Sequence, residues 1–338
     1  MRRKLKNAMT VPLGRGMDQY WLYNKLLDAR DQSEPTYALL GSANWMRALA
    51  IKSANLANDP TAAMQFYSER AKEPRCSVDV GVKALENHYK ALRYLAALKS
   101  FASSSNVYDL IQSAIISWYY AIYFASKAFI LPKSSDVADT HAKVAKQLQH
   151  SVILRGLLIS PFDMNAPTIV EKEFEQYVSK NYPCKSFELI NEPKTPMDAQ
   201  SALVAYLRGT AKYRQEIVKQ DLRKTADFKN LKVDNFRTIK ARMLRDEWLR
   251  KHHVNILVQA FRYRGKANYR DGLYLSYGED QIKKMSQWTV DMHSVARAFM
   301  VMLTTYLLHH VPTELWKEYC SDIKLHTRFN LDEELLIQ

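Results

Sequence analysis

The chain has 338 residues and a formal net charge of +14, with 47% hydrophobic and 25% charged residues, which is the balance of a globular protein with a sizeable core. Only 9 glycines are present, and long periodic apolar runs point away from strands and hairpins, so we predict an all-α multi-helix bundle. The three cysteines are far apart and form no CxxC pair, which argues against a zinc ribbon and favours free thiols in a reducing cytoplasm.

Residues 1–103 are predicted to form an N-terminal helical segment. Its start is basic, but proline and charged residues between 12 and 18 interrupt any apolar stretch, so we expect no secretory signal and a cytoplasmic protein. Asp59 and Pro60 predict a helix start, because aspartate is a good N-cap and proline is tolerated in the first turn.

A second helical unit is predicted over residues 104–312. An excursion at 159–196, rich in prolines, interrupts it. Thr195 and Pro196 then predict the start of a long helix by the same cap and first-turn proline. A short amphipathic tail is expected over residues 313–338.

The most apolar stretch of the chain is SAIISWYYAIYFASKAFIL, residues 113–131. Its 19 residues are long enough to cross a membrane. Lys127 lies inside it, and serines recur along it, so we expect a buried core helix and no membrane span. The apolar run near residues 291–310 is also expected to be buried, since it is apolar almost all round.

Positive charge is concentrated between residues 212 and 270. Seventeen lysines and arginines stand there against six acidic residues, a local net charge of +11. A clustered positive field raises the local concentration of anions, which favours nucleic acid or another phosphate-rich partner. The alternative is that these side chains only make helix faces soluble.

The aromatic helix and the segment after it resemble the HEPN superfamily, a helical nucleotide-binding-type domain of prokaryotes and higher eukaryotes. In that family a helix rich in serine, tyrosine and alanine precedes a loop and a Thr-His pair that begins the next helix. The matching residues here are Ser117, Tyr119, Tyr120, Ala121, Ala125, Ala128, Phe129, Thr140 and His141. The resemblance implies a HEPN-like core, to which residues 1–103 add an N-terminal extension and residues 159–196 a long insertion.

A second segment, RYRGKANYRDGLYL, is similar to the family's R-x-x-A-(D/N)-Y motif. The residues in the matching places are Arg264, Ala267, Asn268 and Tyr269. There is also a fainter likeness to YaaC-like bacterial proteins, which have a comparable aromatic-rich helix followed by Lys-Ala. The same aromatic spacing would also serve as core packing in an unrelated helical bundle.

The stretch RDEWLRKH fits the catalytic pattern of HEPN ribonucleases with Arg245, Asp246 and His252. Seven residues make about two helical turns, so we expect Arg245 and His252 to share a helix face. Histidine can act as an acid or base near neutral pH, and arginine can hold a phosphate and stabilise its developing charge. The resemblance implies that the RNA 2′-hydroxyl is the nucleophile, that no metal or cofactor is needed, and that two protomers pool their pairs across a dimer cleft. The alternative is one more solvated, basic helix.

A second basic constellation lies in FRYRGKANYRD. Guanidinium groups bind phosphates bidentately, and tyrosines can stack on unpaired bases. The residues expected to contact nucleic acid or phosphate are Arg262, Tyr263, Arg264, Lys266, Tyr269 and Arg270. The alternative is a helix end at Gly265 whose basic residues complement the helix dipole.

These features predict a HEPN-like protein that binds RNA or another phosphate-rich partner. The resemblance implies a toxin or antiviral-defence setting, with metal-independent ribonuclease activity as one candidate. Two alternatives stay open. The chain could be a non-enzymatic interaction subunit that docks a nucleotidyltransferase or another effector through its basic surface. It could equally be a structural nucleic-acid-binding protein, which needs the basic segment and not His252.

Overall fold

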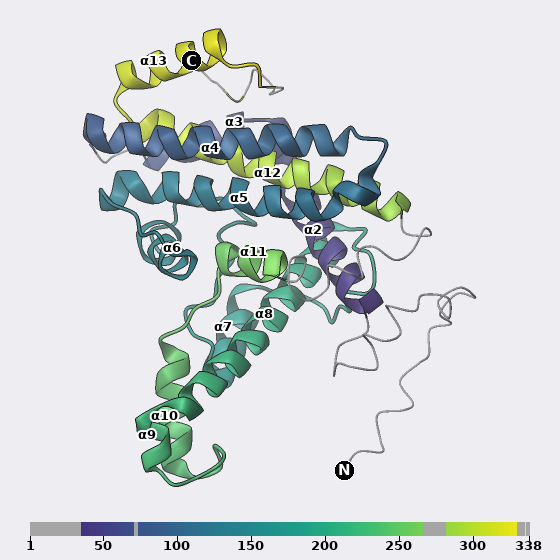
Figure 1. The fold of residues 1–338 in the computed structure, drawn as a ribbon, viewed down its shortest axis with the longest axis vertical. Helices are drawn as coiled ribbons and strands as arrows, with labels where there is room; N and C mark the ends of the chain where they lie inside the picture. Colours follow the sequence, from purple (N-terminus) through teal and green to yellow (C-terminus); the bar gives the residue numbers. More distant parts are fainter. Residues whose placement is uncertain (1–34, 71–73, 266–281, 330–334, 336–338) are drawn as a thin grey trace.

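The computed structural model describes residues 35–70, 74–265, 282–329 and 335, and over these residues the chain is helical and contains no strand (Figure 1). The predicted all-α multi-helix bundle is thereby confirmed. The helices are α2 (Pro35–Asn58), α3 (Thr61–Arg70), α4 (Val78–Ala102), α5 (Val107–Ser134), α6 (His141–Leu148), α7 (Glu171–Asn181), α8 (Pro196–Lys224), α9 (Ala226–Asn230), α10 (Ile239–Arg250), α11 (Ile256–Gly265), α12 (Ile282–His310) and α13 (Thr313–His326). A π-helical turn, Gln149–Ile153, extends α6.

Two helix starts confirm the sequence analysis. The Thr195 side chain accepts a hydrogen bond from the Asp198 backbone N–H at 3.1 Å, and the Asp198 carboxylate accepts one from the Thr195 N–H, also at 3.1 Å. This reciprocal capping box satisfies two otherwise unpaired donors at the start of α8. At α3, the Asp59 carboxylate accepts from the Thr61 N–H at 2.8 Å, as its capping role requires.

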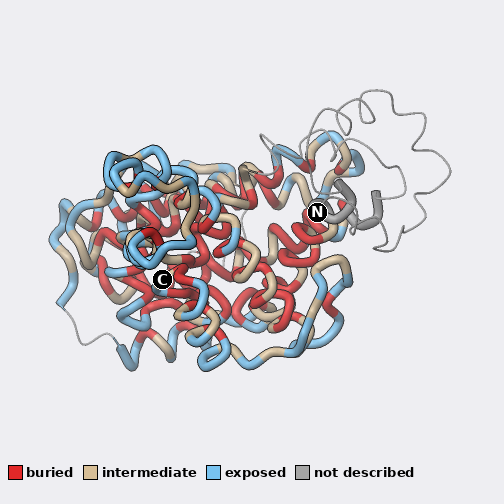
Figure 2. Tube along the Cα trace, turned by 90° about the horizontal axis from the view of Figure 1, so that it is seen from below, coloured by how far each residue is buried: buried red, intermediate tan, exposed pale blue. Residues whose placement is uncertain are grey.

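The body of the molecule is built around α5 and α12. Figure 1 shows α4 and α5 running side by side with α12 behind them, and both pack against α12. Helix α2 crosses at one end and contacts α12 and α8. The interior is filled by large side chains such as Trp118, Phe129, Phe299 and Tyr306, none of which is exposed. The expected burial of the 291–310 run is confirmed, and buried residues gather in the interior of this body in Figure 2.

Helix α5 is long and apolar enough to cross a membrane by length and composition alone, the only such helix among the described residues. Of its most apolar 18-residue window, 78% is buried inside the protein. Helices α4, α12 and α11 cover it, which is the environment expected of a core helix. Lys127 sits at the partly exposed edge of α5, with its ammonium 5.9 Å from the centre of the Tyr123 ring.

The excursion at 159–196 contains a regular helix in spite of its prolines. It contains α7, whose glutamates bind arginines on two other helices. Glu175 pairs with Arg208 of α8 at 2.9 Å, and Glu173 pairs with Arg250 of α10 at 2.6 Å. These contacts hold the excursion against the second half of the chain.

The C-terminal half of α8, together with α9 and α10, projects from the body as a limb (Figure 1). The limb has a small core of its own, centred on Leu222, Phe228 and Ala241. Thr225 and Thr238 cap α9 and α10 by accepting backbone N–H groups at 3.3 Å. Helix α11 then returns the chain to the body, where it packs on α5, α6 and α8.

A buried histidine makes the fold sensitive to acid. His88 of α4 is enclosed between α12 and α13, with its ring nitrogens 2.7 Å from the Tyr319 hydroxyl and 3.0 Å from the Thr304 hydroxyl. Burial lowers its pKa to about 3, because the charged imidazolium would lose its hydration.

The unfolded chain therefore takes up a proton at this histidine near pH ~6.5 while the folded chain does not. We expect the free energy of unfolding to fall by about 1.4 kcal/mol per pH unit through this group as the pH drops from ~6 to ~4. Thermal unfolding across this range should show a smaller pH dependence for His88→Gln than for the wild type. His326→Gln is the control, because His326 is exposed. An unchanged slope in His88→Gln would contradict the assignment.

Candidate functional site

The structure brings together three separate pieces of sequence, from α5, α6 and α11. Tyr119 and Tyr120 come from the middle of α5, His141 is the first residue of α6, and Arg264 lies in the last turn of α11. The Tyr119 hydroxyl lies 2.6 Å from Nδ1 of His141. The Arg264 guanidinium lies 4.7 Å from the centre of the Tyr119 ring and donates to the Tyr120 hydroxyl at 3.3 Å.

Aromatic rings extend this group across α4, α5 and α11. Tyr94 stacks on Tyr120 and on Phe124, with ring centres 5.4 and 5.9 Å apart. Phe261 lies 5.5 Å from the His141 ring and 5.1 Å from the Arg264 guanidinium, and its side chain is exposed. We call the following residues the aromatic–basic surface: Lys90, Tyr94, Tyr120, Phe124, Lys127, His141, Phe261 and Arg264.

Arg264 has no carboxylate partner among the described residues. Among the described residues, its Nε is enclosed without a hydrogen-bond partner, and its other contacts there are with ring faces and one hydroxyl. Cation–π contacts hold the guanidinium in place but do not cancel its charge. A partly buried cation of this kind is available to a phosphate group, which can accept from several N–H donors at once.

The protonation states of the neighbouring residues follow from the same environment. Partial burial lowers the pKa of His141, and the positive charges of Arg264 and Lys127 lower it further. Burial also raises the pKa of Tyr119 far above its usual value, although Arg264 opposes the shift. At neutral pH both groups are therefore uncharged, and they act as hydrogen-bonding groups beside a fixed positive charge.

Arg262 and Tyr263 do not belong to this surface. The Tyr263 side chain is only 1% exposed and packs against Trp45, Trp118 and Trp288 in the core. The prediction that it stacks on bases is wrong, because its ring helps to fill the interior. Arg262 points towards α8, where it donates to the Thr210 hydroxyl at 3.0 Å. Lys266, Ala267, Asn268, Tyr269 and Arg270 lie outside the described residues.

The predicted catalytic group is not assembled in the way the sequence indicated. Helix α10 ends at Arg250, so His252 lies in the connection to α11 and the expectation of a shared helix face with Arg245 is wrong. Arg245 pairs with its neighbour Asp246 at 2.7 Å. His252 instead lies with Nδ1 3.2 Å from the Nη2 atom of Arg214, which is on α8.

Sequence reasoning missed Arg214 and Phe261. Arg214 lies among ordinary helix-forming residues of α8, and nothing nearby in the sequence singles it out. A weak signal existed for Phe261, because it directly precedes the basic RYR triplet. Its exposure on an otherwise apolar helix follows only from how α11 docks on α5 and α6.

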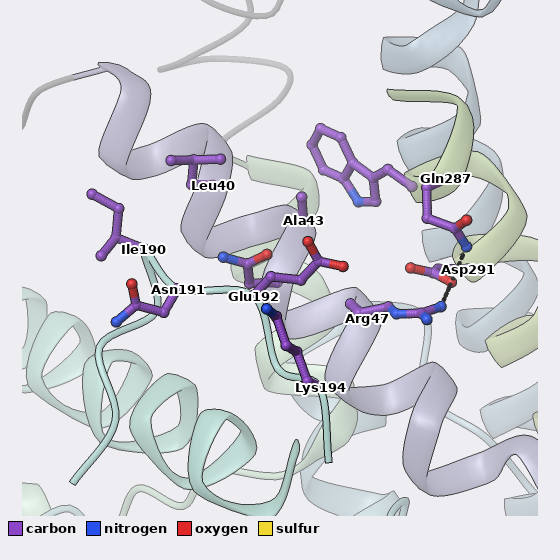
Figure 3. A pocket seen from close by; sticks show the side chains of 11 residues that line it. Leu40, Ala43, Arg47, Ile190, Asn191, Glu192, Lys194, Gln287 and Asp291 are labelled. Atoms are coloured by element: carbon purple, nitrogen blue, oxygen red, sulfur yellow. Dashed lines mark hydrogen bonds and ion pairs between the residues drawn. The ribbon is translucent and has the colours of Figure 1, made fainter. Parts of the chain in front are cut away.

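A cavity of about 620 Å³ lies elsewhere, between α2, α12 and residues 190–194 (Figure 3). On its wall, the Asp291 carboxylate accepts hydrogen bonds from Arg47 and Gln287, both at 2.9 Å. Burial raises the pKa of Asp291, while Gln287 and Arg47 counteract the shift. Glu192 and Lys194 add one charge of each sign. The cavity is therefore lined by two positive and two negative side chains, those of Arg47, Lys194, Asp291 and Glu192.

Comparisons of the chain with protein-family models, curated proteins and solved structures found no match.

The contact between Arg214 and His252 predicts a measurable change in the pKa of His252. Burial lowers this pKa, and the charge of Arg214 lowers it further. In Arg214→Gln we expect the pKa of His252 to rise towards its ordinary value, because the repulsion is removed. Proton NMR titration of the imidazole measures it. Arg245→Gln is the control, since Arg245 binds Asp246, and a shift in that variant alone would contradict the pairing.

Proposed function

We propose that this protein binds single-stranded RNA through the aromatic–basic surface. The observation that carries the proposal is the Arg264 guanidinium, which is held over the rings of Tyr119 and Phe261 and has no carboxylate partner among the described residues. Stacking rings beside fixed cations are the usual means of binding unpaired nucleotides. Unpaired bases can stack on exposed rings, while arginine contacts the backbone phosphates.

The HEPN likeness supports the same proposal. Four of the residues that carry the likeness, Tyr119, Tyr120, His141 and Arg264, come from three separate segments of the sequence and lie together in the fold. If these rings only packed a hydrophobic core, no cation would be required among them. The likeness also supports a toxin or antiviral-defence setting for the RNA-binding function.

RNA cleavage is not part of this proposal. Arg245 and His252 each contact a different residue, and His252 lies beyond the end of the helix that carries Arg245. The geometry of Arg245 and His252 therefore favours RNA binding by the protein over RNA cleavage by these two residues. The neutral His141 beside Arg264 serves binding as a hydrogen-bonding group.

Single-residue variants test the RNA-binding proposal. Fluorescence anisotropy with a labelled single-stranded RNA should show about tenfold weaker binding for Arg264→Gln, because one charge-assisted phosphate contact is lost. The dependence of log affinity on log salt should become shallower by about 0.7, the contribution of one phosphate contact to a single strand. Phe261→Ala should weaken binding by about 1–3 kcal/mol without changing the salt dependence, because stacking is uncharged.

The matched control is Arg70→Gln. Arg70 also stacks on a phenylalanine, with its guanidinium 3.9 Å from the Phe66 ring, but it lies on α3 and contacts Glu69. We expect wild-type binding in this variant. Equal affinities for wild type, Arg264→Gln and Arg70→Gln would refute the proposed surface, and circular dichroism of each variant establishes that it is folded.

A further inference from the structure

A second positive centre lies near the base of the limb, around Arg214 of α8. Its Nη2 donates to Nδ1 of His252 at 3.2 Å. Its Nε is enclosed by the protein and has no hydrogen-bond partner in the part of the chain that the structure describes. No carboxylate of the described residues lies within ion-pair distance of this guanidinium. Burial lowers the pKa of Arg214, which means that its surroundings do not compensate the charge.

Two glutamates of α7 form ion pairs with other arginines. Glu175 of α7 pairs with Arg208, and Glu173 pairs with Arg250. The segment preceding α7 also approaches α8 through a neutral contact, in which the Gln215 amide donates to the Ile169 carbonyl at 2.7 Å. A partly buried cation without a counter-charge costs free energy, and an anion bound from solution recovers it.

The hydrogen bond between Arg214 and His252 sets the direction in which the imidazole can donate. A guanidinium can only donate, so Nδ1 of His252 is the acceptor and the ring proton is on Nε2. The adjacent His253 has its Nε2 3.2 Å from the Ala145 carbonyl, which fixes that ring against α6. The site therefore presents the remaining Nη N–H groups of the guanidinium as donors, because Nε is enclosed and His252 supplies no charge of opposite sign.

We propose that Arg214 and His252 form a binding site for a phosphate group, separate from the aromatic–basic surface. A tetrahedral oxyanion matches these donors, because its oxygens can accept from the remaining Nη N–H groups of the guanidinium. The phosphate can belong to free inorganic phosphate or to a phosphodiester. The site does not depend on RNA binding at Arg264.

Isothermal titration calorimetry tests the site with two probes, inorganic phosphate and a dinucleoside monophosphate. We expect the wild type to bind at least one of them, and the comparison identifies a free phosphate or a diester as the better ligand. Arg214→Gln should weaken binding about tenfold or more, because hydrogen bonds from a charged donor are lost. Arg214→Lys should retain part of the affinity, since it keeps the charge and loses the fork. His252→Asn should show a smaller loss.

Arg223→Gln is the control, because Arg223 lies on the same helix with its guanidinium 5.2 Å from the Phe236 ring. It removes the same charge from the limb and should bind as the wild type does. No binding of either probe to the wild type would overturn the proposal, as would equal losses in Arg214→Gln and Arg223→Gln. Phosphate binding at Arg214 together with unaltered RNA affinity in Arg264→Gln would refute only the proposed RNA surface.

Discussion

The burial of α5 is the constraint on which both the fold and the candidate surface depend. Helices α4 and α12 cover most of this helix, and α11 covers much of the remainder. Tyr119 is fully buried on the side that meets α6 and α11, while Tyr120 is only partly covered. The aromatic–basic surface therefore lies at the edge of the hydrophobic core, where α5 meets α6 and α11. Its rings are held by the same packing that stabilises the bundle, so a ligand would meet side chains that are already in place.

Six arginines of α8, α10 and α11 fall into two groups by their partners. Arg208, Arg245 and Arg250 each contact a carboxylate. Arg208 and Arg250 bind glutamates of α7, while Arg245 binds its neighbour Asp246. The other group contacts rings, a hydroxyl or an imidazole, and each of its members has an enclosed Nε without a partner. This second group consists of Arg214, Arg262 and Arg264. Net charge alone does not separate the groups, because the difference lies in what each guanidinium faces.

The sequence predicted the helical class, the capped starts of α3 and α8, and the burial of the two most apolar helices. These features depend on helix caps and on the periodicity of apolar residues, both of which can be recognised in a sequence window of a few helical turns. It did not predict that α10 stops at Arg250, because no glycine or proline follows and the basic residues at 250–251 are good helix formers. The end is fixed by tertiary contacts of His253 and Asn255, which both bind the Ala145 carbonyl of α6.

The sequence also could not separate the members of FRYR. On a helix, residues two apart are rotated by about 200°, so Arg262 and Arg264 must face opposite sides of α11. Arg264 meets α5, and Arg262 meets α8, where Thr210 and the rings of Tyr206 and Tyr213 surround it.

Tyr263, between the two arginines, then points into the core. A compact basic cluster in the sequence is thereby distributed over two sides of one helix. Arg264 remains at the aromatic–basic surface, while Arg262 joins α11 to α8.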